Sequence, residues 1–116
     1  MKLLVAIIQP TKLNAVREAL VKIGVTRMTV CDSLGYGRQR GQTEMYRGYE
    51  YKTNLLRKVA LEIAVNEDFL DRTLETITQV ARTGPEGTIG DGKIFILPIV
   101  ESVRIDDAVR GAEAIN

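Results

Sequence analysis

Residues 35–55 read GYGRQRGQTEMYRGYEYKTNL and separate two parts of the chain that both show regular hydrophobic patterns. The stretch holds four glycines, three arginines and all four tyrosines, but it has no sustained helical or strand period. Connections in compact domains are usually about 4–6 residues long, and a loop of about twenty residues is typically functional or disordered. Its aromatic and basic side chains argue against a simple linker. The sequence therefore predicts a long, mobile, exposed loop at residues 36–54 that contacts a ligand or a partner.

The part before this loop predicts a strand, a helix and a second strand. Lys2–Ile8 is a continuous apolar run of strand length. Leu13–Ile23 places its apolar residues at helical spacing, and Gly24 is a plausible residue to end that helix. Met28–Leu34 is rich in strand formers. Cys31 lies within it, and we expect a buried, inert thiol there, since free cysteines are usually buried.

The part after the loop repeats this order. Lys58–Val65 alternates, so that Val59, Leu61, Ile63 and Val65 share one face, while Ala60, Glu62 and Ala64 share the other. Asn66 is a good N-cap for a second helix. That helix has an apolar stripe of Leu70, Leu74, Ile77 and Val80 with Ala81. A glycine-rich loop at 82–92 leads to a strand at Lys93–Val100. Val103–Ile105 is a candidate edge strand, and residues 106–116 form a polar, partly ordered tail.

These elements predict the fold class. Two strand–helix–strand halves favour an α+β, ferredoxin-like βαββαβ domain over residues 1–116. Its four-stranded antiparallel sheet carries both helices on one face, with the long exposed loop between strands 2 and 3. The opposite face is then left open, and Leu4, Ala60 and Ala64 are the residues expected on it. Oligomerisation is the natural way to cover such a face.

Composition excludes several function classes. The net charge is +1, so no large field favours nucleic acid or an acidic membrane surface. The chain has no histidine, the usual general base and metal ligand, and no Ser or Cys nucleophile has a recognisable partner base. These features argue against an enzyme. One cysteine suits a reducing compartment, and the first apolar run is too short for a signal peptide, so we expect a cytoplasmic protein.

Four features are candidates for binding. Gly90-Asp91-Gly92-Lys93 brings flexible backbone and a cation together, as an anion cradle requires, although a plain hairpin loop is about twice as common. Gly35-Tyr36-Gly37-Arg38 has the same character, and a glycine hinge is the alternative. Lys58 and Arg104 add cations near strand ends, where solvated surface charge is the default. The tyrosines of the long loop are partner anchors, modification sites or packing residues of the loop itself.

The run GYGRQRGQTEMYRGYEY, Lys58, TIGDGKIF and VRI together resemble the nitrogen regulatory protein P-II family, in order over roughly residues 1–110. The resemblance implies a homotrimeric signalling protein rather than an enzyme. It implies ATP or ADP in clefts between subunits, and 2-oxoglutarate bound together with Mg²⁺ and ATP. The long loop would then act on ammonium transporters and on nitrogen-metabolism enzymes or regulators, so that contact with a membrane arises only through a transporter.

The resemblance also implies roles for individual residues. Nucleotide binding would fall to Ile7, Gly35, Gly37, Arg38, Glu62, Gly90, Gly92, Lys93 and Arg104, with Ile7, Gly35 and Glu62 on the adenine side. Gln39, Gly41 and Lys58 would bind 2-oxoglutarate, and the Gln39 side chain would also contact Mg²⁺. Tyr51 matches the tyrosine that the family uridylylates.

The sequence departs from the family in three places. Residue 49 is Tyr where Ala or Ser is usual. The second glycine-rich loop carries an apparent insert, Pro85-Glu86-Gly87, followed by Thr88 where the family has Lys. Asp106 stands where the family has a second phosphate-binding Arg, so we expect weaker ATP binding and a response tilted towards ADP. The alternative function is a P-II-like nucleotide-binding sensor of a different small molecule.

Overall fold

A computed structural model describes residues 1–36, 44–46, 49–51 and 55–115. The elements in chain order are β1 (Lys2–Ile8), the 3-10 turn η1 (Pro10–Lys12), α1 (Leu13–Lys22), β2 (Thr29–Tyr36), β3 (Glu44–Tyr46), β4 (Tyr49–Tyr51), β5 (Leu55–Val65), α2 (Glu67–Ala81), β6 (Gly92–Pro98) and the 3-10 turn η2 (Gly111–Ile115). Gly24 follows α1 with φ of +93°, the conformation expected of a residue that ends a helix.

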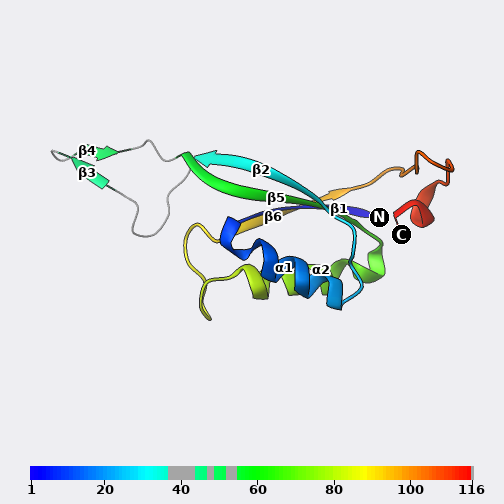
Figure 1. The fold of residues 1–116 in the computed structure, drawn as a ribbon, viewed down its shortest axis with the longest axis horizontal. Coiled ribbons are helices and arrows are strands. Elements are labelled where there is room, and N and C mark those ends of the chain that lie inside the picture. The colour runs from blue at the N-terminus through cyan, green and yellow to red at the C-terminus, as the bar shows by residue number, and fades with distance from the viewer. Residues whose placement is uncertain (37–43, 47–48, 52–54, 116) are drawn as a thin grey trace.

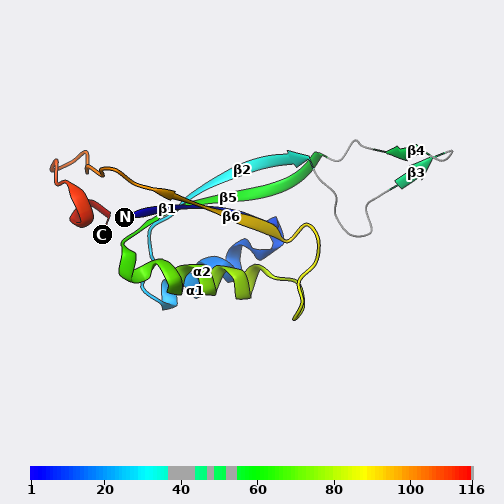
Figure 2. The ribbon, with the colours of Figure 1, turned by 180° about the vertical axis from the view of Figure 1, so that it is seen from behind.

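The main sheet has the strand order β2-β5-β1-β6, and every neighbouring pair is antiparallel. Both helices pack against the same face of this sheet, as the two opposite views show (Figures 1 and 2). The prediction of a ferredoxin-like βαββαβ arrangement is therefore confirmed. The two central strands, β1 and β5, come from different halves of the chain, so the halves share one core.

The core lies between the helices and one face of the sheet. The alternation predicted for β5 is confirmed, because Val59, Leu61, Ile63 and Val65 are all buried there. Leu4, Ala6 and Ile8 of β1 join them, together with Val16 and Leu20 of α1 and Ile77 and Ala81 of α2. Burial of these apolar side chains is the main force that holds the helices on this face.

Two predictions about the open face of the sheet are wrong. Leu4 is fully buried in the core, because β1 turns residues 4, 6 and 8 towards the helices and leaves Leu3, Val5 and Ile7 on the open face. Cys31 is exposed rather than buried, since it lies opposite Ala60 on the open side of β2. Leucine and cysteine are both common in covered strands, so residue type alone does not say which face of the sheet each side chain takes. The alternation of side chains along the paired strands decides it.

The open face is strongly apolar along β1 and the edge strand β6. Phe95 pairs with Val5 and Leu97 with Leu3, and both β6 side chains are about half exposed, at 52% and 43%. Large apolar side chains that remain this exposed on one strand, beside the partly exposed Leu3 and Val5 of β1, are typical of a surface that binds another protein.

Only part of the predicted long loop lies in the described residues. Six residues of it form two short paired strands, β3 and β4, with Glu44 opposite Tyr51, whereas the sequence predicted irregular structure. The ladder between β2 and β5 also continues to Tyr36 and Leu55, beyond the predicted strand ends. Figure 1 shows β3 and β4 standing off the end of β2 and β5. Most of residues 36–54 lie outside the described set, so the predicted mobility of this loop stays a prediction.

The tail is more regular than predicted. Val103 pairs with Arg110 through a single antiparallel bridge, in place of the expected edge strand. η2 follows, and the side-chain amide of Asn66 donates to the carbonyl oxygen of Ala112 at 3.3 Å. This tail lies beside the N-terminus, at the end of the sheet opposite β3 and β4 (Figures 1 and 2).

Within the described part of the chain, no helix is long and apolar enough to span a membrane.

Candidate functional site

Three segments meet at the end of the sheet from which the long loop departs. Lys58, near the start of β5, donates its ammonium to the backbone carbonyl oxygen of Gly90. Gln9, which follows β1, donates its side-chain amide to the same oxygen at 3.0 Å. The Gly90 carbonyl therefore ties the glycine-rich loop at 82–92 to two strands.

Lys58 is 9% exposed as a whole residue, and its ammonium makes a partly buried hydrogen bond. Burial lowers the pKa of Lys58, while the negative charge of Asp91 opposes this change. A cation that is partly removed from water gains more free energy from pairing with an anion than a fully solvated cation does. The structure therefore presents Lys58 as a partly desolvated cation held at the edge of the open face.

Gly92 lies where β6 begins and pairs with Ile8 of β1. Its φ of +118° suits glycine alone, and an added Cβ would lie 1.8 Å from the backbone oxygen of Ile7. The strand contact itself therefore requires glycine at this position, whether or not a phosphate approaches the loop.

Asp91 organises the loop from within. Its Oδ2 accepts backbone N–H groups of Thr83 at 2.9 Å and Thr88 at 2.8 Å, and its Oδ1 accepts the Thr83 hydroxyl at 2.6 Å. Burial alone would raise the pKa of Asp91, but these hydrogen bonds, with the charge of Lys12, hold it below its ordinary value. The carboxylate is thus the internal support of the loop.

We expect Asp91→Asn to loosen this loop. The amide oxygen can still accept both backbone N–H groups and its NH2 can donate to the Thr83 hydroxyl, but these bonds lose the charge of the carboxylate, at a loss of about 1–2 kcal/mol of unfolding free energy at pH 7. A lowered folded pKa means that this stabilisation is present above the unfolded value near 3.8 and is lost as the pH falls through the folded value. Urea unfolding of parent and variant at several pH values measures both effects.

The matched control for this prediction is Glu86→Gln, which changes an exposed carboxylate of the same loop. It should leave both the stability at pH 7 and its decline in acid close to those of the parent. If Asp91→Asn behaves like Glu86→Gln, the loop does not depend on the Asp91 carboxylate.

A groove of about 680 Å³ lies beside the loop. Its walls come from Leu74 and Ile77 of α2, from the loop, and from Ile7 and Lys93 at the ends of β1 and β6. Lys93 also lies over the Phe95 ring, 6.0 Å from its centroid. Glu62 is exposed on the open face and borders a separate hollow of about 420 Å³. It pairs with Val5, so it is a diagonal neighbour of Ile7 on that face, although the two residues line different hollows.

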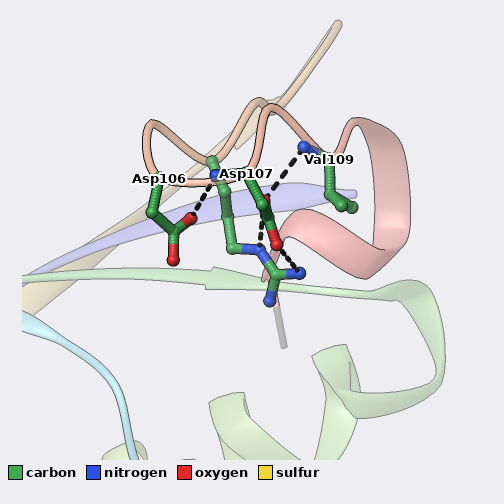
Figure 3. A network of polar contacts seen from close by, with 4 residues as sticks. Asp106, Asp107 and Val109 are labelled. Atoms are coloured by element: carbon green, nitrogen blue, oxygen red, sulfur yellow. Dashed lines mark hydrogen bonds and ion pairs between the residues drawn. The ribbon is translucent and has the colours of Figure 1, made fainter.

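Arg104 lies at the other end of the molecule, in the tail. Its guanidinium pairs with Asp107, with Nη2 2.8 Å from Oδ2 and Nε 3.3 Å from Oδ1 (Figure 3). The backbone N–H of Val109 and this arginine lower the pKa of Asp107. Asp106 is exposed, and its Oδ1 accepts the backbone N–H of Asp107 at 2.8 Å. The Arg104 guanidinium is therefore held by Asp107, three residues further along the same turn.

The predicted nucleotide residues therefore fall into two groups within one chain. Lys93 is the second residue of β6, whereas Arg104 lies six residues beyond the far end of that strand. Gly92 and Pro98 are separated by six residue steps, or about 20 Å along a strand. Gly35, Gly90, Gly92 and Lys93 lie towards the loop end, and Arg104 and Asp106 towards the tail end.

Several predicted site residues lie outside the described set. They are Gly37, Arg38, Gln39 and Gly41, which include the proposed Mg²⁺ contact. Tyr51 is described only as a backbone position in β4, opposite Glu44. In the described ranges, no cluster of three or more His, Cys, Asp or Glu side chains is arranged to hold a metal ion.

Three residues of the site region were missed from the sequence. The sequence pattern assigns no role to Gln9 or to Asp107, and it marks Asp91 only as part of Gly90-Asp91-Gly92-Lys93. The spacing of Asp91 from Thr83 and Thr88 is a signal that could have indicated a capped loop, because aspartate commonly accepts nearby backbone N–H groups. Nothing local marks Gln9, whose acceptor is 81 residues away.

The family profile described as "Nitrogen regulatory protein P-II" matches residues 1–108. The chain belongs to the P-II family. Nitrogen regulatory protein GlnK1 of Methanosarcina mazei is 48% identical over 99% of this chain and 97% of its own length. Nitrogen regulatory protein P-II 1 of Escherichia coli K12 is 50% identical over 90% of this chain and 91% of its own.

A solved P-II structure supports the same conclusion at the level of the fold. The crystal structure of Arabidopsis thaliana PII, described as bound to citrate, matches with a TM-score of 0.76 and 33% identity, covering 98% of this chain and 88% of that one. The similarity to the P-II family inferred from the sequence is thus confirmed. This P-II protein is a nitrogen signalling protein, and its relatives are named as regulatory proteins rather than enzymes.

Proposed function

We propose that this P-II protein is a homotrimeric sensor that binds ATP or ADP, with Mg²⁺ and 2-oxoglutarate, in clefts between its subunits. The observation that carries this proposal is the separation of its cationic residues. Lys93 and Arg104 lie towards opposite ends of one chain, so a single triphosphate meets both only when they come from different copies. Lys93 would then lie at the loop end of one subunit and Arg104 in the tail of its neighbour.

The chemistry of the residues suits these ligands. A triphosphate calls for several cations and for flexible backbone, which Gly90, Gly92, Lys93 and Arg104 offer. A dicarboxylate calls for a cation such as Lys58. Gln39 and Gly41 are proposed, with Lys58, for 2-oxoglutarate. Mg²⁺ favours oxygen ligands, and the proposed protein contact for it is the Gln39 side chain. Gly37 and Arg38 are proposed for the phosphates, and Ile7, Gly35 and Glu62 for the adenine.

The proposed trimer predicts a mass of about three times 12.9 kDa by light scattering. Its physical basis is the apolar open face and the exposed β6 edge, which a neighbouring copy would cover. Replacing Phe95, which is 52% exposed there, by Glu should shift the protein towards smaller species, whereas Val21→Glu on the outer side of α1 should not. A parent protein that remains a monomer at micromolar concentration would contradict both the assembly and the shared site.

We propose that the long loop at residues 36–54 transmits the signal to partner proteins. It would bind or release ammonium transporters and nitrogen-metabolism enzymes or regulators in the cytoplasm, with membrane contact only through a transporter. Tyr51 is the proposed site of uridylylation. Nucleic acid is not a proposed partner, because the net charge is only +1.

Titration calorimetry tests the proposed ligands directly. We expect heats of binding for ADP, for ATP, and for 2-oxoglutarate only when Mg²⁺ and ATP are present. Citrate is an informative competitor, because the Arabidopsis thaliana PII structure is described as bound to citrate, which is also a carboxylic acid. Nucleotide binding without 2-oxoglutarate binding would favour the alternative, a P-II-like sensor of a different small molecule. No nucleotide binding at all would overturn both functions.

A further inference from the structure

Gln9 has no role in the proposed site, yet it shares its acceptor with Lys58. The Gly90 carbonyl oxygen receives the Lys58 ammonium and the Gln9 amide together. The two donors come from neighbouring strands, because Ile8 pairs with Val59 and the next residues along are Gln9 and Lys58. A carbonyl oxygen has two lone pairs, so these two donors satisfy it fully.

This shared acceptor links two proposed binding regions. Lys58 is the cation proposed for a dicarboxylate, and Gly90 lies in the loop proposed for the phosphates. An anion that draws the Lys58 ammonium towards itself removes one of the two hydrogen bonds of Gly90. The Gly90 carbonyl then keeps only its hydrogen bond with the Gln9 amide.

We propose that Gln9 is a positioning residue that holds the Gly90 carbonyl in place when a carboxylate ligand withdraws Lys58. The inference rests on the proposed function, since 2-oxoglutarate is the carboxylate concerned. Gln9 need not contact this ligand. It acts by keeping a partly buried backbone acceptor satisfied in the liganded state, so that withdrawal of Lys58 does not leave that acceptor without a partner.

The test compares Gln9→Leu with the parent by calorimetry. Leucine keeps a similar bulk but has no donor, so the Gly90 carbonyl loses its second partner when Lys58 leaves. We expect 2-oxoglutarate affinity, measured with Mg²⁺ and ATP, to fall about five- to tenfold, and ADP affinity to stay within about twofold. If Gln9 only stabilises the loop, the variant should instead lose affinity for 2-oxoglutarate and for ADP in parallel.

Lys12→Met is the matched control. Lys12 also joins a side-chain amine to the backbone of this loop, at 3.5 Å from the Arg82 carbonyl oxygen, but it does not share an acceptor with Lys58. Its loss should leave the ratio of 2-oxoglutarate to ADP affinity unchanged. Gln9→Glu provides a second variant of nearly the same shape, and its carboxylate competes for Lys58, so the selective loss of 2-oxoglutarate affinity should be larger.

Hydrogen exchange over residues 82–92 supplies a readout that does not depend on affinity. On addition of 2-oxoglutarate, exchange should rise in Gln9→Leu and not in the parent or in Lys12→Met. Equal 2-oxoglutarate affinity in parent and Gln9→Leu, or a parallel loss of ADP affinity, would overturn the role of Gln9. If the parent itself binds no 2-oxoglutarate, the proposed function fails, and the role of Gln9 fails with it.

Discussion

Gly92→Ala is expected to unfold the protein or to lower its unfolding free energy by more than about 4 kcal/mol, which is a large share of the stability of an ordinary domain. The added Cβ would lie 1.8 Å from the Ile7 oxygen and 2.9 Å from the Ile7 carbonyl carbon. These atoms are backbone in the central strand β1, so no side chain can turn aside to make room. The pairing of β6 with β1 would have to open at this point.

Urea unfolding followed by circular dichroism measures this effect, and Gly84→Ala is the matched control. Gly84 lies in the same loop with a φ of +68°, but a Cβ there would meet no atom within 4 Å. The control should therefore lose only about 1–2 kcal/mol of unfolding free energy, because alanine adopts the left-handed conformation there without any atomic overlap. If the two variants lose similar stability, β1 and β6 do not approach as closely as the structure describes.

Lys58→Met is expected to abolish 2-oxoglutarate binding and to leave ADP binding largely intact. Methionine retains the apolar stem of the lysine and removes the charge, so the change is directed at the ammonium. Loss of a charge-assisted contact with a carboxylate costs about 1.5–3 kcal/mol or more, which is roughly ten- to 150-fold in affinity. Partial burial of Lys58 reduces screening by water and so strengthens its contact with a carboxylate.

Calorimetry with ADP, and with 2-oxoglutarate in the presence of Mg²⁺ and ATP, measures this prediction. Lys22→Met is the control: it removes an exposed lysine from the last turn of α1 and should change neither affinity. The fold should survive in Lys58→Met, because Gln9 still donates to the Gly90 carbonyl. Unchanged 2-oxoglutarate affinity in this variant would remove Lys58 from the proposed site.

The elements of the fold were largely predictable, because their signals are local. The apolar run of β1 and the alternation of β5 matched the observed strands, and the stripe of α2 matched the observed helix. The errors arose where one strand meets another. Leu4 was assigned to the wrong face because a continuous apolar run does not say which residues face the helices. Cys31 was expected to be buried because free cysteines usually are, but its strand turns it to the open face.

The candidate site was predictable only in part. Family resemblance identified Lys58, Gly90 and Lys93, and the structure places all three towards the same end of the sheet. Gln9 and Asp107 were not identified. Gln9 acts on a backbone atom 81 residues away, and a backbone carbonyl leaves no trace in the sequence pattern. Asp107 was recognisable as a turn residue, but its bidentate pair with Arg104 depends on how that turn closes.

The sequence alone determined the order of strands and helices, the ferredoxin-like class and the P-II family, because hydrophobic period and motif spacing are properties of neighbouring residues. Tertiary structure alone decided the register, which residues form the exposed apolar face, the requirement for glycine at Gly92 and the separation of Lys93 from Arg104. These features depend on which strands pair and in what alignment. Such pairing joins residues far apart in the chain, and it is settled by burial of the shared core rather than by any local pattern.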